Sequence, residues 1–459
     1  MNNKSFQLTL ALLWGILIAS SGSLFAAETK PPNVIVILCD DVGYGEFGFQ
    51  GNKEIPTPNI DSIAAQGMRF TNGYVAATYC SPCRAGLLTG RYPTRFGHEF
   101  NPGGSKDTAG LSLNEKTMAD RLKSLGYATA CVGKWHLGRG DKFIATARGF
   151  DEFYGTPENT PFFLPPSFID TRVSKDVVRV EDKNFYTTDA YAARAVNWLA
   201  KQKEKPYFLY LPFNAQHAPL EAPEKYLQRF PNLEGDRKIF AAMMSAMDDA
   251  VGAVLGKVRE MGQEENTLVF FFSDNGGPTK QTTSGNGPLR GFKSTTLEGG
   301  TRVPFCVQWK GKIPAGTTFE HPIQNLDILP TAVAAAGGTI EADWKLDGVD
   351  LMPYLQGKVK SPPHEVLFWR FGEQWAIRKG DWKLCANSID GVENVKLFNL
   401  KDDIGEAKDL SAAEPEKVKE LQSLWNKWSA EQAAPSWTPQ KPQKKNARKE
   451  GKNRNPKKQ

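Results

Sequence analysis

The stretch TYCSPCRAGLLTGR, Thr78 to Arg91, places Cys80 and Cys83 three residues apart. Two thiols at this spacing are candidates for a redox pair, half of a metal site or a structural disulfide. The sequence has no second Cys-x-x-Cys pair, which argues strongly against a four-cysteine zinc site. A redox pair is also disfavoured, because it should open a helix in a compact domain rather than precede Arg84 in a chain of 459 residues.

Polar residues follow four apolar runs that are typical of buried strands. The runs are 33–38, 127–133, 207–213 and 267–273, and the residues after them include Asp40, Asp41, Lys134, His136, Asn214, His217, Asp274 and Asn275. Ligands of parallel sheets bind beyond the carboxyl ends of the strands, so these side chains should meet at one edge. Carboxylate and amide oxygens suit Ca²⁺ or Mg²⁺ rather than zinc. The sequence therefore predicts an active site with a hard cation at this edge.

The order Cys80-x-Pro82-x-Arg84, followed by Leu88-Thr89-Gly90-Arg91, resembles the signature of the type I sulfatases of the alkaline-phosphatase-like superfamily. In that family a maturation enzyme oxidises the cysteine to Cα-formylglycine (3-oxoalanine), the catalytic aldehyde. The resemblance implies the same conversion of Cys80, with a formylglycine-generating enzyme as a partner. Where this chain has Cys83 the family often has Ser or Ala, and a competing Cys80–Cys83 disulfide is the alternative that this departure leaves open.

Further motifs of that family follow in the same order, over roughly Asn33 to Leu410. GKWHLG (133–138), AQHAP (215–219) and LRGFKSTTLEGGTRVP (289–304) match its Lys-x-His motif, its second histidine and its late lysine block. The resemblance implies a calcium ion whose ligands are Asp40, Asp41, the modified Cys80, Asp274 and Asn275.

The resemblance also implies a role for each remaining residue. One hydroxyl of the hydrated aldehyde would attack sulfur and form a covalent sulfate ester, while His217 with Lys293 protonates the departing alcohol. His136 would then take a proton from the second hydroxyl and so expel sulfate, a step for which serine lacks the second hydroxyl. Lys134, His217 and Lys293 would bind the sulfate group, and Arg84 would hold the formylglycine and the metal ligands in position.

The implied activity is hydrolysis of sulfate esters, and exported enzymes of this type most often act on sulfated carbohydrates. We therefore expect a polysaccharide or its oligosaccharides as substrate, with the loops His98–Gly104 and Pro157–Ser167 as candidates to reach a glycan. The alternatives are an arylsulfatase, a phosphate or phosphonate ester hydrolase of the same superfamily, and a non-catalytic glycan binder. The binder is disfavoured because no catalytic position is substituted.

Each of these residues also has an ordinary structural interpretation. A lone histidine is more often a satisfied polar group than a catalyst, and we place His98, His321 and His364 in that class. Asp40 and Asp41, taken alone, are acceptable helix caps. Several of the six cysteines lie inside apolar, strand-like runs and are expected to be buried thiols.

The elements that must position the site belong to an α/β fold. Helical patterns at 59–68, 117–126 and 191–202 alternate with the apolar runs, which predicts a large mixed, mostly parallel sheet sandwiched by helices. Pro82 fits the first turn of a helix, whose N-terminal amides would face an anion. After about Gln356, alternating apolar and polar residues around a Lys379-Gly380-Asp381 turn, with a strand at 395–400 and a helix at 414–432, predict a smaller antiparallel sheet and terminal helix.

We expect four segments: a signal peptide at 1–27, the catalytic domain at 28–355, a C-terminal subdomain at 356–433 and a basic disordered tail at 434–459. The leader combines Lys4, an apolar run from Leu8 to Ile18 and small residues around Ala26. That pattern is typical of a signal peptide and is short for a membrane span, so the protein should be exported, periplasmic or secreted, with no transmembrane segment.

The formal charge of +6 is dominated by the tail. Residues 441–459 carry nine Lys and Arg and one Glu, so after subtraction of this segment and Lys4 the remaining chain has a charge of −3. Residues 441–459 have no aromatic or branched apolar residues, which predicts disorder. Without interleaved aromatics or a folded motif, nucleic acid is not an expected partner.

Overall fold

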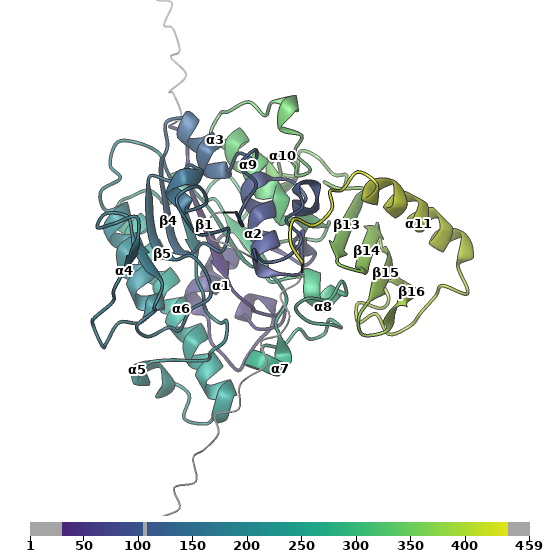
Figure 1. The fold of residues 1–459 in the computed structure, drawn as a ribbon, viewed down its shortest axis with the longest axis horizontal. Coiled ribbons are helices and arrows are strands. Elements are labelled where there is room, and N and C mark those ends of the chain that lie inside the picture. Colours follow the sequence, from purple (N-terminus) through teal and green to yellow (C-terminus); the bar gives the residue numbers. More distant parts are fainter. Residues whose placement is uncertain (1–29, 104–107, 439–459) are drawn as a thin grey trace, which may run out of the picture. The chain divides into compact units, whose positions relative to one another are not determined.

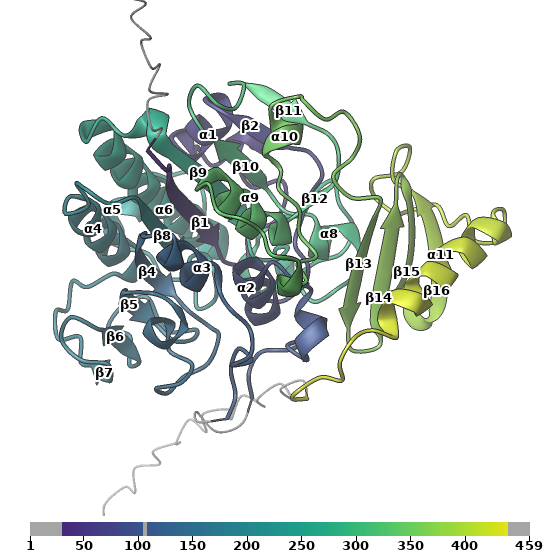
Figure 2. The ribbon, with the colours of Figure 1, turned by 90° about the horizontal axis from the view of Figure 1, so that it is seen from above.

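The computed structural model describes residues 30–103 and 108–438 (Figure 1). Its centre is a ten-stranded sheet in the order β11-β2-β10-β9-β1-β8-β4-β5-β6-β7 (Figure 2). The strands are β1 (Asn33–Cys39), β2 (Met68–Phe70), β4 (Ala128–Lys134), β5 (Glu152–Thr156), β6 (Phe168–Asp170), β7 (Val177–Val178), β8 (Tyr207–Pro212), β9 (Thr267–Ser273), β10 (Phe305–Gln308) and β11 (Thr317–Phe319). A separate pair is formed by β3 (Gly73–Tyr74) and β12 (Ile323–Gln324).

Five neighbouring strands, β9, β1, β8, β4 and β5, run parallel. β10 pairs antiparallel with both β9 and β2, and β6 pairs antiparallel with β5 and β7. The predicted mixed, mostly parallel sheet is therefore confirmed. Its consequence for function is that the carboxyl ends of β1, β4, β8 and β9 lie along one edge, with Cys39 directly opposite Ser273.

Helices cover both faces of this sheet (Figure 2). Along the chain, the described helices are α1 (Pro58–Ala65), α2 (Cys80–Thr89), α3 (Met118–Ser124), α4 (Thr187–Leu199), α5 (Glu224–Leu227), α6 (Gly235–Glu260), α7 (Thr279–Thr282), α8 (Glu298–Thr301), α9 (Ile328–Ala335), α10 (Met352–Leu355) and, in the C-terminal part, α11 (Pro415–Ser429). Short 3₁₀ turns lie at Gly48–Gln50, Pro93–Phe96, Ala145–Arg148, Glu264–Asn266, Asn325–Asp327 and Ala342–Trp344.

Strand β1 shows why the sheet needs both layers, because every one of its residues is buried. Val34, Val36 and Leu38 belong to the core that includes α2, α3, α9 and α10. Ile35 and Ile37 point to the opposite face and join the core of α1, α4 and α6. Alternate side chains of a strand point to opposite faces, so an unbroken apolar run fits a sheet covered on both sides.

The predicted elements occur within a few residues of their expected bounds. The four apolar runs became β1, β4, β8 and β9, and the helical patterns became α1, α3 and α4. Helix α6 is the one helix of the described residues that is long and apolar enough to cross a membrane. However, 72% of its most apolar stretch is buried inside the protein, so its composition is accounted for by core packing.

A second, antiparallel sheet follows in the chain. It consists of β13 (Val366–Phe371), β14 (Gln374–Lys379), β15 (Trp382–Asn387) and β16 (Gly391–Asn399). Lys379 pairs with Trp382 across the predicted turn, where Gly380 takes the left-handed conformation at φ 58°. Helix α11 packs on this sheet, with the rings of Trp375 and Trp425 4.6 Å apart. The C-terminal antiparallel sheet with its terminal helix is thus confirmed.

The first residues of the predicted tail, 434–438, make specific contacts. The Ser436 N–H donates to the Gly97 carbonyl at 2.8 Å, and the Trp437 indole donates to the Phe100 carbonyl at 2.8 Å. Trp437 also packs on His98, so this aromatic ring holds the chain down before the basic residues begin. The leader (1–27) and residues 439–459 lie outside the described residues.

Candidate active site

Cys80 is the first residue of α2 and is completely buried. Tyr79 before it is extended, Pro82 lies in the first turn as predicted, and Gly90 ends the helix in the left-handed conformation. The Cys80 thiol lies 3.2 Å from the Lys293 ammonium nitrogen and 3.5 Å from Asp40 Oδ1. The N-terminus of α2 therefore presents the candidate nucleophile to charges from other elements.

Three carboxylates from two strand ends surround this thiol. One ligand atom each of Asp40, Asp41, Asp274 and Cys80 lie within 4.8 Å of one another. The Asn275 amide donates to Asp41 Oδ1 at 2.7 Å, while its buried Oδ1 has no hydrogen-bond partner in the described part of the chain. Asp41 is held at φ 66°, a strained conformation for a residue other than glycine. The crowded oxygens and the orphaned amide oxygen fit a hard cation such as Ca²⁺.

Three cations balance these carboxylates. The Arg84 guanidinium, fully buried, donates to Asp274 at 2.8 Å, to Asp40 at 3.2 Å and to the Lys134 carbonyl at 2.8 Å. Lys134, at the end of β4, pairs with Asp40. Lys293 pairs with Asp41 at 2.6 Å. Arg84 thus joins α2 to the ends of β1, β4 and β9, which is the positioning role that the resemblance implied.

The pKa values show how crowded the carboxylates are. Burial would raise the pKa of Asp40, but Lys134 and Arg84 outweigh burial and lower that pKa below its usual value. Burial, together with the charge of Asp40, raises the pKa of Asp274 to about 6. An added proton on one of the carboxylates relieves the repulsion, and a bound cation would do the same.

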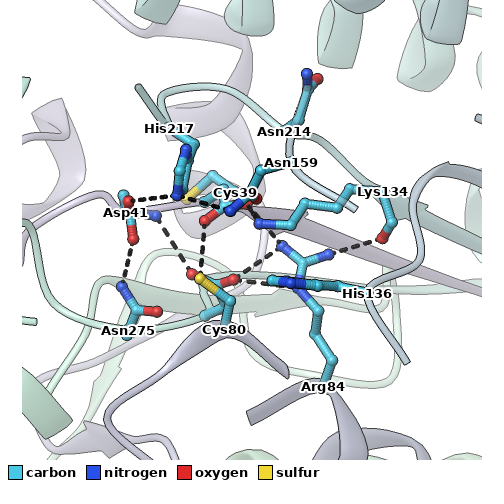
Figure 3. A network of polar contacts seen from close by, with 12 residues as sticks. Cys39, Asp41, Cys80, Arg84, Lys134, His136, Asn159, Asn214, His217 and Asn275 are labelled. Carbon is cyan, nitrogen blue, oxygen red and sulfur yellow. Dashed lines mark hydrogen bonds and ion pairs between the residues drawn. The ribbon is translucent and has the colours of Figure 1, made fainter. Parts of the chain in front are cut away.

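His217 lies in the loop after β8 and faces Asp41. Its Nδ1 is 2.6 Å from the Ala218 carbonyl, which only accepts, so Nδ1 carries the proton. Nε2 lies 3.6 Å from Asp41 Oδ2 and accepts from the Asn159 amide at 3.1 Å (Figure 3). Burial lowers the pKa of His217, against the opposing charge of Asp41. In this state Nε2 is an acceptor that points into the site.

His136 is held by its backbone. Its φ of 57° is left-handed, and its carbonyl accepts from the Ser81 hydroxyl at 2.5 Å. Since the single Ser81 proton is used in that bond, His98 Nε2 donates to Ser81 Oγ, 2.7 Å away. Burial, followed by the charge of Lys134, lowers the pKa of His136 well below its usual value. Its buried Nδ1 has no hydrogen-bond partner within the described residues.

The structure therefore brings all the predicted site residues together: Asp40, Asp41, Cys80, Arg84, Lys134, His136, His217, Asp274, Asn275 and Lys293. Ser81 and Asn159 were missed as individual residues, although Asn159 lies in a loop that was expected to reach the substrate. His98 was expected to be an ordinary satisfied histidine; its Nε2 bonds Ser81, and its Nδ1 has no hydrogen-bond partner among the residues that the structure describes. His364 pairs with Asp327 at 2.8 Å, and His321 packs on Phe319, so neither joins the site.

The remaining cysteine predictions are also tested. All six cysteines are free and buried, as expected for thiols in apolar runs. Cys83 has its sulfur 3.3 Å from the Asn325 amide, and no disulfide joins it to Cys80. The first residues of the loop His98–Gly104 are also buried, because Glu99 pairs with Arg370 at 2.7 Å and Phe100 packs on Phe371. That half of the loop faces inward rather than toward a glycan.

Comparison with known proteins decides the family. The model of the sulfatase family matches residues 32–338, and a model described as the C-terminal part of N-sulphoglucosamine sulphohydrolase matches 292–433. Arylsulfatase A of Bos taurus is 35% identical over 445 residues, which cover 86% of each chain. The chain belongs to the sulfatase family.

Two further relatives support the assignment. N-acetylgalactosamine-6-sulfatase of Sus scrofa is 31% identical to this sulfatase over 90% of this chain and 88% of the relative. The crystal structure of Ps i-CgsB has a TM-score of 0.81 and 34% identity and covers 89% of this chain and 95% of its own. The sulfatase is therefore a sulfuric ester hydrolase, and the matches extend through both the large sheet and the C-terminal sheet.

Proposed function

We propose that this sulfatase removes sulfate from sulfated carbohydrates, with Cys80 converted to Cα-formylglycine and a calcium ion bound beside it. The observation that supports the proposal most directly is the burial of Cys80 among three carboxylates and three cations at the end of four strands. A buried site with so many charges is expensive to maintain and is typical of catalysis on a charged substrate.

The unmodified thiol is a poor candidate for the nucleophile. Burial and the charge of Asp40 raise the pKa of Cys80 far above its usual value, and the thiol rather than the thiolate then predominates at neutral pH. When Cys80 is converted, the hydrated aldehyde supplies two hydroxyls on one carbon, one to attack sulfur and one to release the product. The Cys80-Ser81-Pro82-Cys83-Arg84 frame supports the conversion by a formylglycine-generating enzyme.

The oxygen-rich set of Asp40, Asp41, Asp274 and Asn275 would hold Ca²⁺ together with the converted Cys80 side chain. The ion would supply positive charge to a site whose protein charges are otherwise balanced, which favours binding of an anionic sulfate ester. Zinc is a less suitable occupant, because Asp40, Asp41, Asp274 and Asn275 offer oxygen ligands, whereas zinc is most often held by histidine and thiolate.

The chain's own residues then divide the remaining work. Lys293, beside the Cys80 sulfur, and Lys134, paired with Asp40, are placed to hold sulfate oxygens as point charges. His217 Nε2, assisted by Lys293, would deliver a proton to the leaving alcohol oxygen. His136 would accept a proton as sulfate is released. Arg84 holds the Asp40 and Asp274 carboxylates in position relative to α2.

The carbohydrate assignment is supported by two relatives. One is named N-acetylgalactosamine-6-sulfatase, and Ps i-CgsB has been solved in complex with k-i-k-neocarrahexaose at 34% identity to this chain. A polysaccharide or its oligosaccharides are therefore our proposed substrates. Arylsulfatase activity is the second candidate, favoured by the 35% identity to arylsulfatase A. Export to the periplasm or medium, through the leader at 1–27, belongs to the same proposal.

A substrate panel tests the function. Purified protein, produced together with a formylglycine-generating enzyme, is incubated with sulfated oligosaccharides, an aryl sulfate and the matched phosphate esters, and released anions are measured by ion chromatography. We expect sulfate release with the highest kcat/KM on an oligosaccharide. A higher kcat/KM on the aryl sulfate would favour the arylsulfatase alternative, and preferential phosphate release would overturn the sulfatase activity.

Metal dependence is a separate prediction. Dialysis against a chelator should remove activity, because the three carboxylates then repel one another and the site loses its excess positive charge. Ca²⁺ should restore more activity than Zn²⁺, and isothermal titration should show a site that is lost in Asp41→Ala. Full activity in protein shown by elemental analysis to be free of metal would contradict the calcium assignment.

A further inference from the structure

The segment Arg290–Glu298, here called the lysine loop, carries Lys293 and lies between the nucleophile and the C-terminal sheet. On the inner side, Lys293 contacts Cys80 and Asp41, as described above. Ser294, the next residue, is left-handed at φ 68°, and its N–H donates to the Thr78 carbonyl at 2.9 Å. This strained backbone sets the direction of the Lys293 side chain and needs external support to persist.

The C-terminal sheet supplies that support at three points along the loop. Arg290 forms a two-pronged ion pair with Asp390, with contacts of 2.7 and 2.9 Å. The Thr296 hydroxyl donates to the Ala386 carbonyl of β15 at 3.1 Å. Between these two, the Gln374 amide of β14 donates to the Ser294 carbonyl at 2.9 Å.

Gln374 uses both ends of its amide. While Nε2 donates to Ser294, Oε1 accepts from the Ser388 N–H at 3.0 Å. The side chain is buried, with only 8% of the residue exposed, so loss of the amide leaves two backbone groups without this partner. Ser294 is the residue directly after Lys293. Of the three contacts described between the C-terminal sheet and the loop, the one made by Gln374 is therefore the nearest to Lys293 along the chain.

A buried ion cluster anchors the far end of the loop. Lys383 of β15 pairs with Glu298 at 2.8 Å and with Glu406 at 2.9 Å, and all three side chains are fully buried. Glu406 also accepts from the Glu298 N–H at 2.7 Å. Breaking one partner of such a cluster is strongly destabilising, so the end of the loop at Glu298 is fixed on the C-terminal sheet.

We propose that Gln374 is a positioning residue for Lys293, through which the C-terminal sheet sets the place of the catalytic lysine. The proposal rests on the proposed function in one respect, namely that Lys293 acts on the sulfate ester. It assigns to the C-terminal sheet a part in turnover, because the sheet supports the strained loop from the side opposite to its backbone contact with Thr78.

The test is a double-mutant cycle of Gln374→Ala and Lys293→Ala in the full chain, converted at Cys80. Gln374→Ala alone should lower kcat/KM by about tenfold, the effect of one lost buried hydrogen bond. Lys293→Ala should lower it by at least about a hundredfold. The double variant should be no slower than Lys293→Ala, because Gln374 acts only through that lysine. Gln422→Ala, on α11 and away from the loop, is the matched control and should equal wild type.

Two further variants keep the inference testable if Gln374→Ala folds poorly. Gln374→Glu retains the acceptor for Ser388 but opposes the Ser294 carbonyl with a carboxylate, so its activity relative to Gln374→Ala should recover as the pH falls and the carboxyl becomes a donor. Thr296→Val removes the neighbouring loop contact at nearly constant volume and should give a smaller loss that also disappears on Lys293→Ala. Thermal unfolding of each variant reports its folding.

The outcomes separate the two hypotheses. If Gln374→Ala multiplies the loss of Lys293→Ala, or matches wild type while folded, the positioning role is overturned. If Lys293→Ala itself retains wild-type turnover, the proposed function of Lys293 fails instead.

Discussion

Replacing Cys80 with serine should abolish multiple turnover, with steady-state activity lower by more than about a thousandfold. Serine presents one hydroxyl at the N-terminus of α2, in place to take sulfate under the same charges of Lys293 and Asp40. It lacks a second hydroxyl on that carbon with which to expel the sulfate. The variant should therefore complete at most one turnover and retain sulfate on residue 80, visible as a mass increase of the 80–84 peptide.

Cys83→Ser provides the matched control for this prediction. Cys83 is three residues further along the same helix, equally buried, and its sulfur faces Asn325 rather than the site. Its replacement by serine should leave turnover close to wild type, and Asn325 still has a partner. In wild-type protein, peptide mass spectrometry should find the aldehyde at position 80. An unmodified thiol there in fully active protein, or sustained turnover by the Cys80→Ser variant, would refute the proposed nucleophile.

The second large effect concerns His217. His217→Ala should lower kcat/KM by about 10²–10⁴-fold on sulfate esters of sugar alcohols, the usual range for a general acid, and by much less on aryl sulfates. A sugar alkoxide is a poor leaving group and needs a proton, whereas a phenolate leaves readily without one. Because Nδ1 is engaged by the Ala218 carbonyl, Nε2 is the atom that would deliver the proton once the ring is protonated.

The pH dependence of activity on sugar esters tests the same role of His217. Burial lowers the pKa of His217, so the imidazolium fraction falls as the pH rises through that lowered value. Wild-type activity on sugar esters should decline with rising pH, and the corresponding limb should be absent in His217→Ala. His136→Ala should instead slow both substrate classes, because release of sulfate is common to them. His321→Ala, remote from the site, is the control; equal losses on both classes for His217→Ala would contradict its assigned role.

The sequence alone determined the elements and the edge where chemistry occurs. Apolar runs of six or seven residues, bounded by polar ones, specify buried strands such as β1 and β9 by hydrophobic burial, which is a local property of the pattern. Parallel strands place their carboxyl ends at one edge, so Asp40, Lys134 and Asp274 were bound to converge once the sheet was predicted. The ordered motifs then identified the residues individually, from Cys80 to Lys293.

Only the tertiary structure decided which partners hold these residues in place. The Asn159–His217 contact joins residues 58 positions apart, and the Gln374–Ser294 contact joins residues 80 positions apart. The sequence around a glutamine in a strand or an asparagine in a loop does not indicate which distant residue will be its hydrogen-bond partner. Trp437 is a similar case. It lies in the segment that was predicted to be a disordered tail, but its ring packs on His98 near the start of α2. Such contacts depend on how two sheets and their loops pack, and that packing is set by the whole core rather than by any one segment.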